Sequence, residues 1–303
     1  MKFGLVALMN NKNSKLISII VPCFNSGKTI KRTIESLKNQ TWRQKEIIVV
    51  NDGSNDLDTL NILNSLEGVL LINQKNFGLS AARNAGANKA KGRFLFFIDS
   101  DDWIEEDCLE LMFNYSKENC SNNNNFYIFS DIALEGNIKK NVTKNYNFFE
   151  QLFLNQVPYS IFIERNTWQL NNGYDENMRL GYEDWEFNIR LGAKNIFGKR
   201  LPLPLFHYSV CSSGMLISKS SKYHAQIWNY IKNKHSELYK PKKILMNWKL
   251  WRKKDSSYPL IIFCLWYVLL QVCPNRINSI IFLLLRNFKW IFTRNKFYYQ
   301  NKL

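Results

Sequence analysis

Short apolar runs alternate with segments of helical periodicity along the first hundred positions. An apolar run of about four to eight residues is typical of a strand that is covered on both faces. Four runs fit this description: 17–22, 46–50, 69–72 and 94–98. Three intervening segments carry apolar residues at helical spacing: 29–37, 60–66 and 79–90. The β-α-β-α-β-α-β order predicts an α/β, Rossmann-like fold with a mostly parallel sheet flanked by helices.

The pattern is less regular in the following hundred residues. Residues 122–125 indicate an exposed polar joint. The elements expected after it are a strand at 126–129, ordered segments at 148–154 and 159–163, a helix at 183–191 and a strand at 201–207. Because Pro202 and Pro204 cannot donate ladder hydrogen bonds, we expect the last strand to lie at an edge of the sheet.

Polar clusters follow three of the predicted strands, at residues 23–25, 51–54 and 99–102. In open parallel sheets, ligands bind outside the carboxyl ends of the strands. Separate turns and helix caps would also be polar, but three clusters at one rim favour a shared binding site. The sequence therefore predicts a nucleotide and metal site at this rim.

The cluster at 99–102 contains three carboxylates, Asp99, Asp101 and Asp102. Hard divalent cations such as Mg²⁺ and Mn²⁺ prefer oxygen ligands and often combine one or two carboxylates with substrate phosphates. The alternative is an acidic turn in which Asp102 caps a helix beginning at Trp103. Both interpretations are compatible with the residues alone.

The positive charge of the chain lies mainly in its last quarter. The 303 residues carry a net charge of +16 at pH 7, and residues 240–303 hold thirteen Lys and Arg against one acid, Asp255. The same region holds the most apolar stretch of the chain, which favours an anionic membrane surface over nucleic acid. We therefore expect a catalytic domain at 1–222 and a basic, apolar, helical C-terminal region at 223–303 that associates with a membrane.

Two segments of this region determine how it could contact a membrane. Residues 258–273 are apolar, but this segment is shorter than the ~20 residues of a spanning helix. Apolar residues from 277 to 292 recur at helical spacing, as in an amphipathic helix lying on a membrane surface. The alternative is a helical hairpin packed on the catalytic domain.

The cysteines and the N-terminus indicate the compartment. The six cysteines form no C-x-x-C pair, so we expect reduced thiols in a cytoplasmic protein. Residues 3–9 are apolar but lead into a polar stretch without a small-residue cleavage site, so secretion is not expected. Together with the C-terminal region, this predicts a peripheral protein on the inner face of the cell membrane.

Five motifs in order resemble family 2 glycosyltransferases of the GT-A fold, of the non-processive type that builds bacterial surface polysaccharides. They are Ser18-Ile-Ile-Val-Pro-Cys-Phe-Asn25, Ile48-Val-Val-Asn-Asp-Gly-Ser54, Asn76-Phe-Gly-Leu-Ser-Ala-Ala-Arg-Asn84, Asp99-Ser-Asp-Asp102 and Glu183-Asp184. The resemblance covers roughly residues 16 to 215. It implies inverting transfer of a sugar from a nucleotide-sugar to an acceptor hydroxyl, assisted by Mn²⁺ or Mg²⁺.

The resemblance also assigns roles to individual residues. The implied donor-binding residues are Pro22, Phe24, Asp52, Arg83, Asp99, Ser100 and Asp101, and the implied metal ligands are Asp101, Asp99 and His207. Asp184 is the implied base, although a carboxylate at a helix N-terminus is also favourable without catalysis. Alternation along a strand would point Asp99 and Asp101 to one side, which leaves Asp102 to cap or orient.

Four residues of the motifs and their surroundings have simple physical interpretations. Phe24 would cover a uracil ring, and Asp52 would accept a hydrogen bond from the uracil imide N–H, which favours UDP or dTDP. Arg83 would neutralise the diphosphate, and Trp185 would offer a stacking surface to a sugar. The alternatives are a core aromatic for Phe24, a helix-surface salt bridge for Arg83 and a satisfied structural histidine for His207.

One departure from the family's pattern bears on the product. The chain contains no Q-x-x-R-W sequence, which marks processive members, so we expect addition of a single sugar or a short non-processive extension. The acceptor implied is a lipid-linked or surface glycan of capsule, O-antigen or lipooligosaccharide type. The alternatives are a sugar-phosphate nucleotidyltransferase and a non-catalytic basic membrane-binding protein; binding of nucleic acid is not expected.

Overall fold

The computed structural model describes residues 14–119, 126–136, 139–143, 145–210, 223–254, 262–265 and 267–268. The predictions for residues 3–9, 122–125 and 277–292, and for most of 258–273, lie outside these described residues. Among the described cysteines, Cys23, Cys108 and Cys264 are free thiols. No helix in the described part of the chain is both long and apolar enough to cross a membrane.

The N-terminal half contains the predicted alternation of strands and helices. The strands are β1 (Ile17–Cys23), β2 (Lys45–Asp52), β3 (Leu70–Gln74) and β4 (Phe94–Phe97), and the helices are α2 (Ile30–Lys38), α3 (Leu57–Ser65) and α4 (Leu79–Lys89). The strands are parallel in the order β3-β2-β1-β4. Side chains of β1 alternate between two apolar layers: Ile19 packs with α2, and Ile20 packs with α4. This half confirms the α/β prediction.

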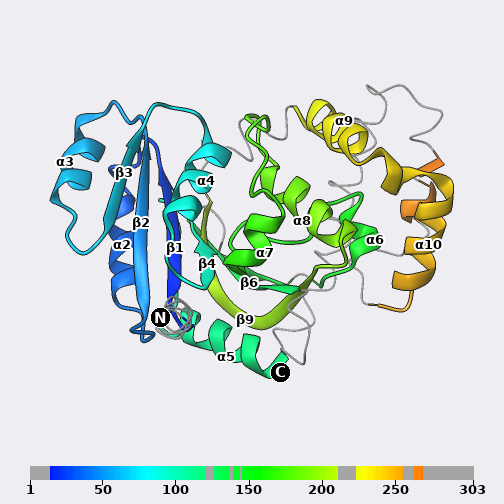
Figure 1. Ribbon diagram of the computed structural model, residues 1–303, viewed down its shortest axis with the longest axis horizontal. Coiled ribbons are helices and arrows are strands. Elements are labelled where there is room, and N and C mark those ends of the chain that lie inside the picture. The colour runs from blue at the N-terminus through cyan, green and yellow to red at the C-terminus, as the bar shows by residue number, and fades with distance from the viewer. Residues whose placement is uncertain are drawn as a thin grey trace, which may run out of the picture.

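The second half of the sheet is mixed. Its elements are β5 (Trp103–Ile104), α5 (Cys108–Asn119), β6 (Phe126–Gly136), β7 (Lys140–Val142), β8 (Phe162–Glu164) and β9 (Phe197–Val210). β8 is antiparallel to β4 and β6, β9 is parallel to β6, and β5 is antiparallel to β9. The long β9 curls beneath the centre of the molecule (Figure 1). The expected mostly parallel sheet is therefore wrong for this half, because an apolar run covered on both faces looks the same in either strand direction.

The last strand is not an edge strand. β9 pairs with β6 on one side and with β5 on the other, where Trp103 lies opposite His207. The β6–β9 ladder shifts register between Ser130 and Ile132, and Pro202 and Pro204 lie in the corresponding interruption of β9. Proline is tolerated at such a bulge because no ladder hydrogen bond from its nitrogen is required there. The prolines therefore mark an irregularity within the sheet.

The C-terminal helices pack on the central helices. The remaining elements are α6 (Phe148–Gln151), α7 (Arg165–Leu170), α8 (Glu183–Ala193), α9 (His224–Lys234), the 3₁₀ helix η2 (Ser236–Tyr239) and α10 (Pro241–Trp251). Ile231 of α9 and Ile244 of α10 share an apolar cluster with Phe149 of α6 and Ile189 of α8. The predicted domain boundary at 222/223 stays a prediction, because residues 211–222 lie outside the described residues. Figure 1 shows α9 and α10 at the end of the molecule opposite α3.

Candidate active site

The polar clusters at the carboxyl ends of β1, β2 and β4 meet, as the sequence predicts. Asn25 donates its backbone N–H to Ser54 Oγ at 3.1 Å, which joins the ends of β1 and β2. Ser100 Oγ donates to Ser26 Oγ at 2.8 Å, which joins the ends of β4 and β1. Phe24 beside them is 46% exposed, so its ring is available to a ligand and is not a core aromatic. The three clusters therefore form one rim.

Asp52 is buried beneath this rim and organises the loop after β3. Its Oδ1 accepts hydrogen bonds from Gln74 Nε2 at 2.7 Å and from the Phe77 backbone N–H at 2.9 Å. Its Oδ2 accepts a hydrogen bond from the Gly78 backbone N–H at 2.9 Å, and no other residue in the described part of the chain donates to this oxygen. Since a carboxylate oxygen has two lone pairs, Oδ2 retains one acceptor position for a ligand.

Residues 99–102 form a turn, because the Asp102 backbone N–H donates to the Asp99 carbonyl at 3.2 Å. Strand alternation therefore does not decide where these side chains point. Asp102 does not cap the next helix: Trp103 and Ile104 are in β5, and α5 begins at Cys108. The buried Asp102 carboxylate instead accepts hydrogen bonds from Tyr159 Oη and from the backbone N–H of Ser209.

The three carboxylates of this turn have distinct electrostatic surroundings. Burial, and less strongly the Asp101 charge, raise the pKa of Asp99 to about 6 against the opposing effect of Arg83. Burial followed by the charges of Asp101 and Asp99 raises the pKa of Asp102 well above its usual range. Burial also raises the pKa of Asp101. A bound divalent cation would stabilise the ionised forms of these clustered carboxylates and thereby lower their pKa values.

The hydrogen bonds around Asp101 also fit the predicted metal site. Arg32 and Ser209 donate to its backbone carbonyl, at 3.0 and 2.5 Å. No hydrogen bond from another described residue reaches its carboxylate, which is half-buried. A carboxylate held in place through its main chain, with its oxygens uncommitted, suits Mg²⁺ or Mn²⁺ shared with substrate phosphates.

Arg83 is fully buried and joins the two acidic parts of the site. Its guanidinium contacts Asp99 Oδ1 at 2.6 Å and Glu183 Oε1 at 2.5 Å. It also lies over the ring of Tyr159, 4.8 Å from the ring centre. The alternative of a helix-surface salt bridge is wrong. Arg83 connects the turn after β4 with the first residue of α8.

His207 lies between two glutamates. Its Nε2 is 2.7 Å from Glu105 Oε1 and its Nδ1 is 3.2 Å from Glu135 Oε1, while its ring stacks on Trp103 with centroids 3.5 Å apart. Both ring nitrogens thus have protein partners, as the alternative of a structural histidine expects. Within the described ranges, no group of three or more His, Cys, Asp or Glu side chains could hold a metal ion by itself. Ligation by His207 stays a prediction.

The predicted base, Asp184, lies in the first turn of α8. The Trp185 backbone N–H donates to its Oδ1 and Asn155 Nδ2 donates to its Oδ2, both at 2.8 Å. Burial, and then the charge of Glu183, raise the pKa of Asp184 to about 6. A half-buried carboxylate with this pKa is ionised at pH 7 and still basic enough to accept a proton.

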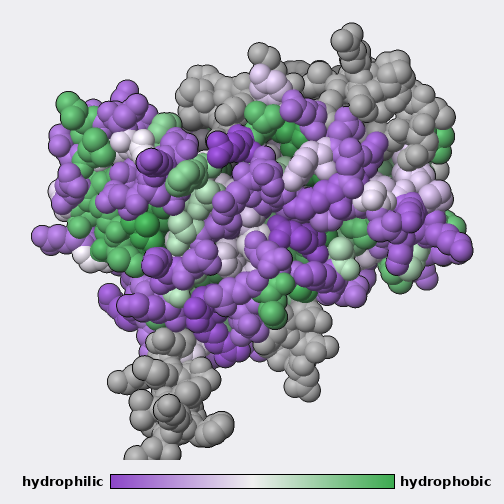
Figure 2. Space-filling model, turned by 45° about the horizontal axis from the view of Figure 1, so that its top comes forward, coloured by the Kyte–Doolittle hydropathy of each residue, from purple (hydrophilic) through white to green (hydrophobic). Residues whose placement is uncertain are grey.

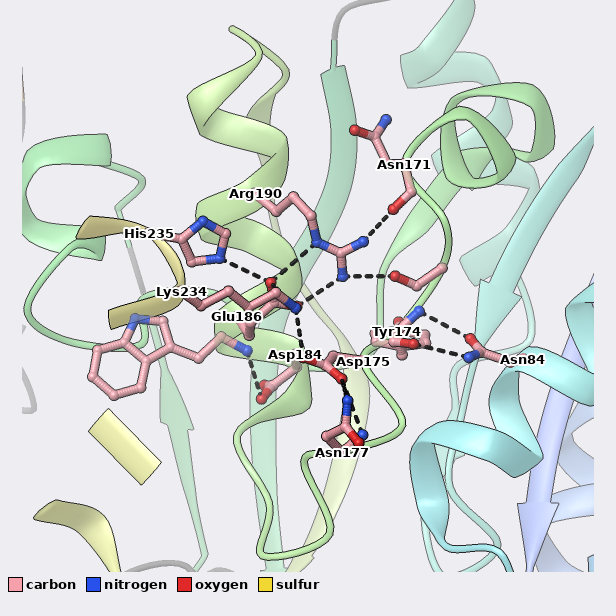
Figure 3. Close-up of polar contacts among 12 residues, drawn as sticks. Asn84, Asn171, Tyr174, Asp175, Asn177, Asp184, Glu186, Arg190, Lys234 and His235 are labelled. Atoms are coloured by element: carbon pink, nitrogen blue, oxygen red, sulfur yellow. Dashed lines mark hydrogen bonds and ion pairs between the residues drawn. The ribbon is translucent and has the colours of Figure 1, made fainter. Parts of the chain in front are cut away.

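Trp185 does not offer a sugar-stacking surface. Its side chain is fully buried, and its Nε1 donates to the Gln151 carbonyl at 2.7 Å. Tyr182, the residue before α8, has a left-handed backbone conformation (φ 62°). From the helix that follows, the Trp185 side chain is buried in the protein, whereas Asp184 stays partly exposed. Figure 3 shows Asp184 with the neighbouring polar contacts of α8 and α9.

Sequence reasoning missed Tyr159 and Asn155. Tyr159 Oη lies between the Asp99 backbone N–H, at 3.0 Å, and the Asp102 carboxylate. Asn155 orients Asp184. Both precede β8, and neither belongs to a motif: Tyr159 lies in a segment whose pattern shows only that it is ordered, and Asn155 lies between two such segments, so no local signal identifies them.

Comparison with known proteins identifies the family of the chain. The model of the family described as glycosyl transferase family 2 matches residues 18–174. An uncharacterised glycosyltransferase of Haemophilus influenzae is 31% identical over 233 residues, which cover 72% of this chain and 87% of the relative.

Other relatives match over shorter segments. The poly(ribitol-phosphate) β-N-acetylglucosaminyltransferase TarP of Staphylococcus aureus is 42% identical over 113 residues, which are 35% of this chain and 35% of TarP. The glycosyltransferase GlyA of Streptococcus pneumoniae is 34% identical over 46% of this chain, and the match spans 22% of GlyA.

The solved structure of S. aureus TarS in complex with UDP-GlcNAc has the same fold. It aligns with a TM-score of 0.59 at 19% identity and covers 71% of this chain and 65% of the TarS chain. The likeness supports the GT-A fold with its curled mixed sheet.

Proposed function

The chain belongs to glycosyl transferase family 2 and is a glycosyltransferase, and from this premise we propose a specific reaction. The enzyme transfers a single sugar from a UDP-sugar to a hydroxyl group of a lipid-linked or surface glycan, with inversion and with the help of Mn²⁺ or Mg²⁺. The name of TarP and the UDP-GlcNAc complex of TarS support this choice of donor and acceptor class.

One structural observation carries the proposal. Arg83 joins Asp99, at the donor rim, to Glu183, which immediately precedes Asp184. A buried guanidinium that contacts two carboxylates fixes the positions of both, because breaking either contact leaves a carboxylate without its cationic partner. The donor side and the predicted base are thereby held in one arrangement, as a displacement reaction requires.

On the donor side, two residues would recognise the base of the nucleotide. The exposed ring of Phe24 can stack on a pyrimidine, and Asp52 Oδ2 can accept from an imide N–H. Asp101, with Asp99 beside it, would hold the metal ion. When bound, the ion supplies positive charge for the departing diphosphate. Arg83 would act on the diphosphate mainly by orienting Asp99.

On the acceptor side, Asp184 would remove the proton of the attacking hydroxyl group. Asn155 and the N-terminal end of α8 orient its carboxylate, and the adjacent Glu183 is neutralised by Arg83. Inversion requires the base on the face of the sugar opposite the leaving group. This assignment gives the acidic turn and Asp184 separate tasks, namely donor binding and proton removal.

Replacement of Asp101 by Ala should remove metal-dependent binding of UDP. The expected cause is loss of the one rim carboxylate to which no other described residue hydrogen bonds. Calorimetric titration with UDP, with and without Mn²⁺, measures the effect, and Asp107→Asn, at an exposed position, is the control. Unchanged Mn²⁺-dependent affinity in Asp101→Ala would remove it as the ligand.

The overall function is tested by nucleotide release from a panel of UDP-, GDP- and dTDP-sugars with Mn²⁺. We expect release from a UDP- or dTDP-sugar, because Asp52 and Phe24 suit a pyrimidine with an imide N–H. Exclusive release from GDP-sugars would contradict the donor assignment. Formation of a nucleotide-sugar from a nucleoside triphosphate would indicate a nucleotidyltransferase.

We also propose that the C-terminal region holds the enzyme at the anionic inner face of the cell membrane. Its described part includes the outer face of α10, which we define as Lys242, Lys243, Leu245, Met246, Lys249 and Leu250. All six side chains are exposed, and no acidic residue lies between 240 and 254. Hydrophobic and hydrophilic residues are interspersed at this end of the molecule (Figure 2). Such a face suits anionic lipid headgroups.

Reversal of the three lysine charges on this face to Glu should weaken binding to phosphatidylserine-containing vesicles by at least about 100-fold, because loss of the three positive charges alone removes roughly 1 kcal/mol each near the surface. Vesicle co-sedimentation measures the change. The matched control reverses three exposed lysines of α2 and α4: Lys31, Lys38 and Lys89. An equal loss in both triple variants would show a general charge effect and count against the α10 face.

A further inference from the structure

The loop between α7 and α8 is anchored to α4. Asn84 of α4 donates from Nδ2 to the Tyr174 carbonyl and accepts from the Tyr174 backbone N–H, both at 2.9 Å. This pair of bonds fixes the backbone of Tyr174 through both its N–H and its carbonyl group. Because the loop leads directly into Glu183 and Asp184, its position determines where α8 begins.

A second anchor of the loop comes from α9. Tyr230 Oη and Lys234 Nζ both contact Asp175 Oδ2, at 2.7 and 2.5 Å. The side chain of Asp175 is 7% exposed. Burial alone would raise the pKa of Asp175, but the hydrogen bonds from Lys234 and Tyr230 lower it to about 2. Asp175 is therefore a buried negative charge whose cationic partner is Lys234.

Lys234 also reaches the first turn of α8. Its Nζ is 3.0 Å from Glu186 Oε1, and the Glu186 side chain is fully buried. His235 Nε2 lies 2.8 Å from the same oxygen, and Arg190 Nη2 donates to Glu186 Oε2 at 2.7 Å. Burial would raise the pKa of Glu186, but these partners lower it to about 2. Figure 3 shows the bonds that converge on Glu186.

The helix that carries Lys234 is itself firmly seated. Ile227, Trp228 and Ile231 of α9 are buried in the apolar cluster that includes Trp185 and Ile189 of α8. The Lys234 ammonium is therefore presented from a packed helix, and it bridges two carboxylates on either side of residue 184. Asp175 lies nine positions before Asp184, and Glu186 lies two positions after it.

We propose that Lys234 is a positioning residue for Asp184, and that α9 is thereby part of the catalytic unit. By joining Asp175 in the loop to Glu186 in α8, Lys234 fixes the chain on both sides of the base. The proposal rests on the proposed function, in which Asp184 removes the acceptor proton. It concerns the base only, because Lys234 contacts neither Asp52 nor the turn at 99–102.

The experiment uses the full chain with Lys234→Met and, as a matched control, Lys232→Met. Both lysines lie in the last turn of α9, so both changes remove the same charge from the same helix end. We expect Lys234→Met to lower kcat about 10- to 100-fold, as for a base displaced by about 1 Å. The KM for the donor should stay within about twofold. Lys234→Arg, which keeps the bridging charge, should recover most of the activity.

A second readout does not depend on catalysis. Hydrogen exchange of the backbone amides of residues 175–186 should be faster in Lys234→Met than in Lys232→Met, because one anchor of the loop is lost. Asp175→Asn should also lower kcat, and the loss in the double variant should be smaller than the sum of the two single losses, because both changes break the contact between Lys234 and Asp175.

The outcomes separate the proposal from the proposed function. Unchanged exchange in Lys234→Met overturns the anchoring role, and faster exchange with unchanged kcat overturns the positioning role. Equal losses in kcat and donor affinity in Lys234→Met would show a general structural effect, and this result would also overturn the positioning role. If Asp184→Asn keeps full transfer activity, the assignment of the base fails, whatever the exchange measurement shows.

Discussion

Asp184→Asn should lower kcat for sugar transfer by about 10²- to 10⁴-fold, the usual contribution of a general base. The substitution keeps the size of the side chain and its ability to accept from the Trp185 backbone N–H. It removes the group that takes the acceptor proton. Affinity for UDP with Mn²⁺ should be unchanged, because the donor contacts belong to other residues. Steady-state transfer rates and UDP titration measure the two quantities.

The pH dependence of the unmodified enzyme should agree with this result. Burial and the charge of Glu183 raise the pKa of Asp184 to about 6. The deprotonated form is the base, so kcat should fall as the pH is lowered through about 6 and reach a plateau above it. Asp58→Asn, an exposed acid in the first turn of α3, is the matched control and should change neither kcat nor the profile. Unchanged transfer in Asp184→Asn would remove it as the base.

Arg83→Met should destabilise the fold by about 3–5 kcal/mol, the usual cost of breaking a buried ion pair by removing one partner. Arg83 is fully buried, and its loss leaves Asp99 and Glu183 without their shared cation. Met approximates the length of the aliphatic part, so the loss of packing is small compared with the loss of charge pairing. Urea denaturation measures the free energy of unfolding.

The control for Arg83 is an exposed ion pair in the same chain. Arg93 contacts Glu164 at 2.9 Å, and its side chain is 46% exposed. Arg93→Met should therefore cost at most about 1 kcal/mol, as for other surface pairs. A free energy of unfolding in Arg83→Met within about 1 kcal/mol of that in Arg93→Met would contradict the account of Arg83 as the link across the site.

The sequence was sufficient for those parts of the fold whose signal is local. Apolar runs and helical spacing located β1 to β4 and their helices, and the polar residues after those strands predicted the shared rim. Strand direction in the second half carries no such signal, because β8 and β9 are apolar runs whichever neighbour they pair with. The prolines of β9 led to the wrong prediction of an edge strand, because a bulge within a sheet tolerates proline as well as an edge strand does.

The candidate site was predictable only to the level of single motifs. The motifs named Asp99, Arg83 and Glu183–Asp184, but nothing in them indicates that Arg83 is buried between two carboxylates. That arrangement depends on contacts between residues up to a hundred positions apart. The roles of Lys234 and Tyr159 could not be predicted from the sequence, because these roles depend entirely on contacts with residues that are distant along the chain.

The central claim, that Asp184 acts as a base opposite the leaving group, is tested most directly by the stereochemistry of the product. The measurement is the proton NMR spectrum of the first product formed from an α-linked UDP-sugar in the presence of Mn²⁺. An inverting reaction yields the β-anomer, and the same product should form far more slowly in Asp184→Asn. An α-anomer as the first product would show retention and contradict the account.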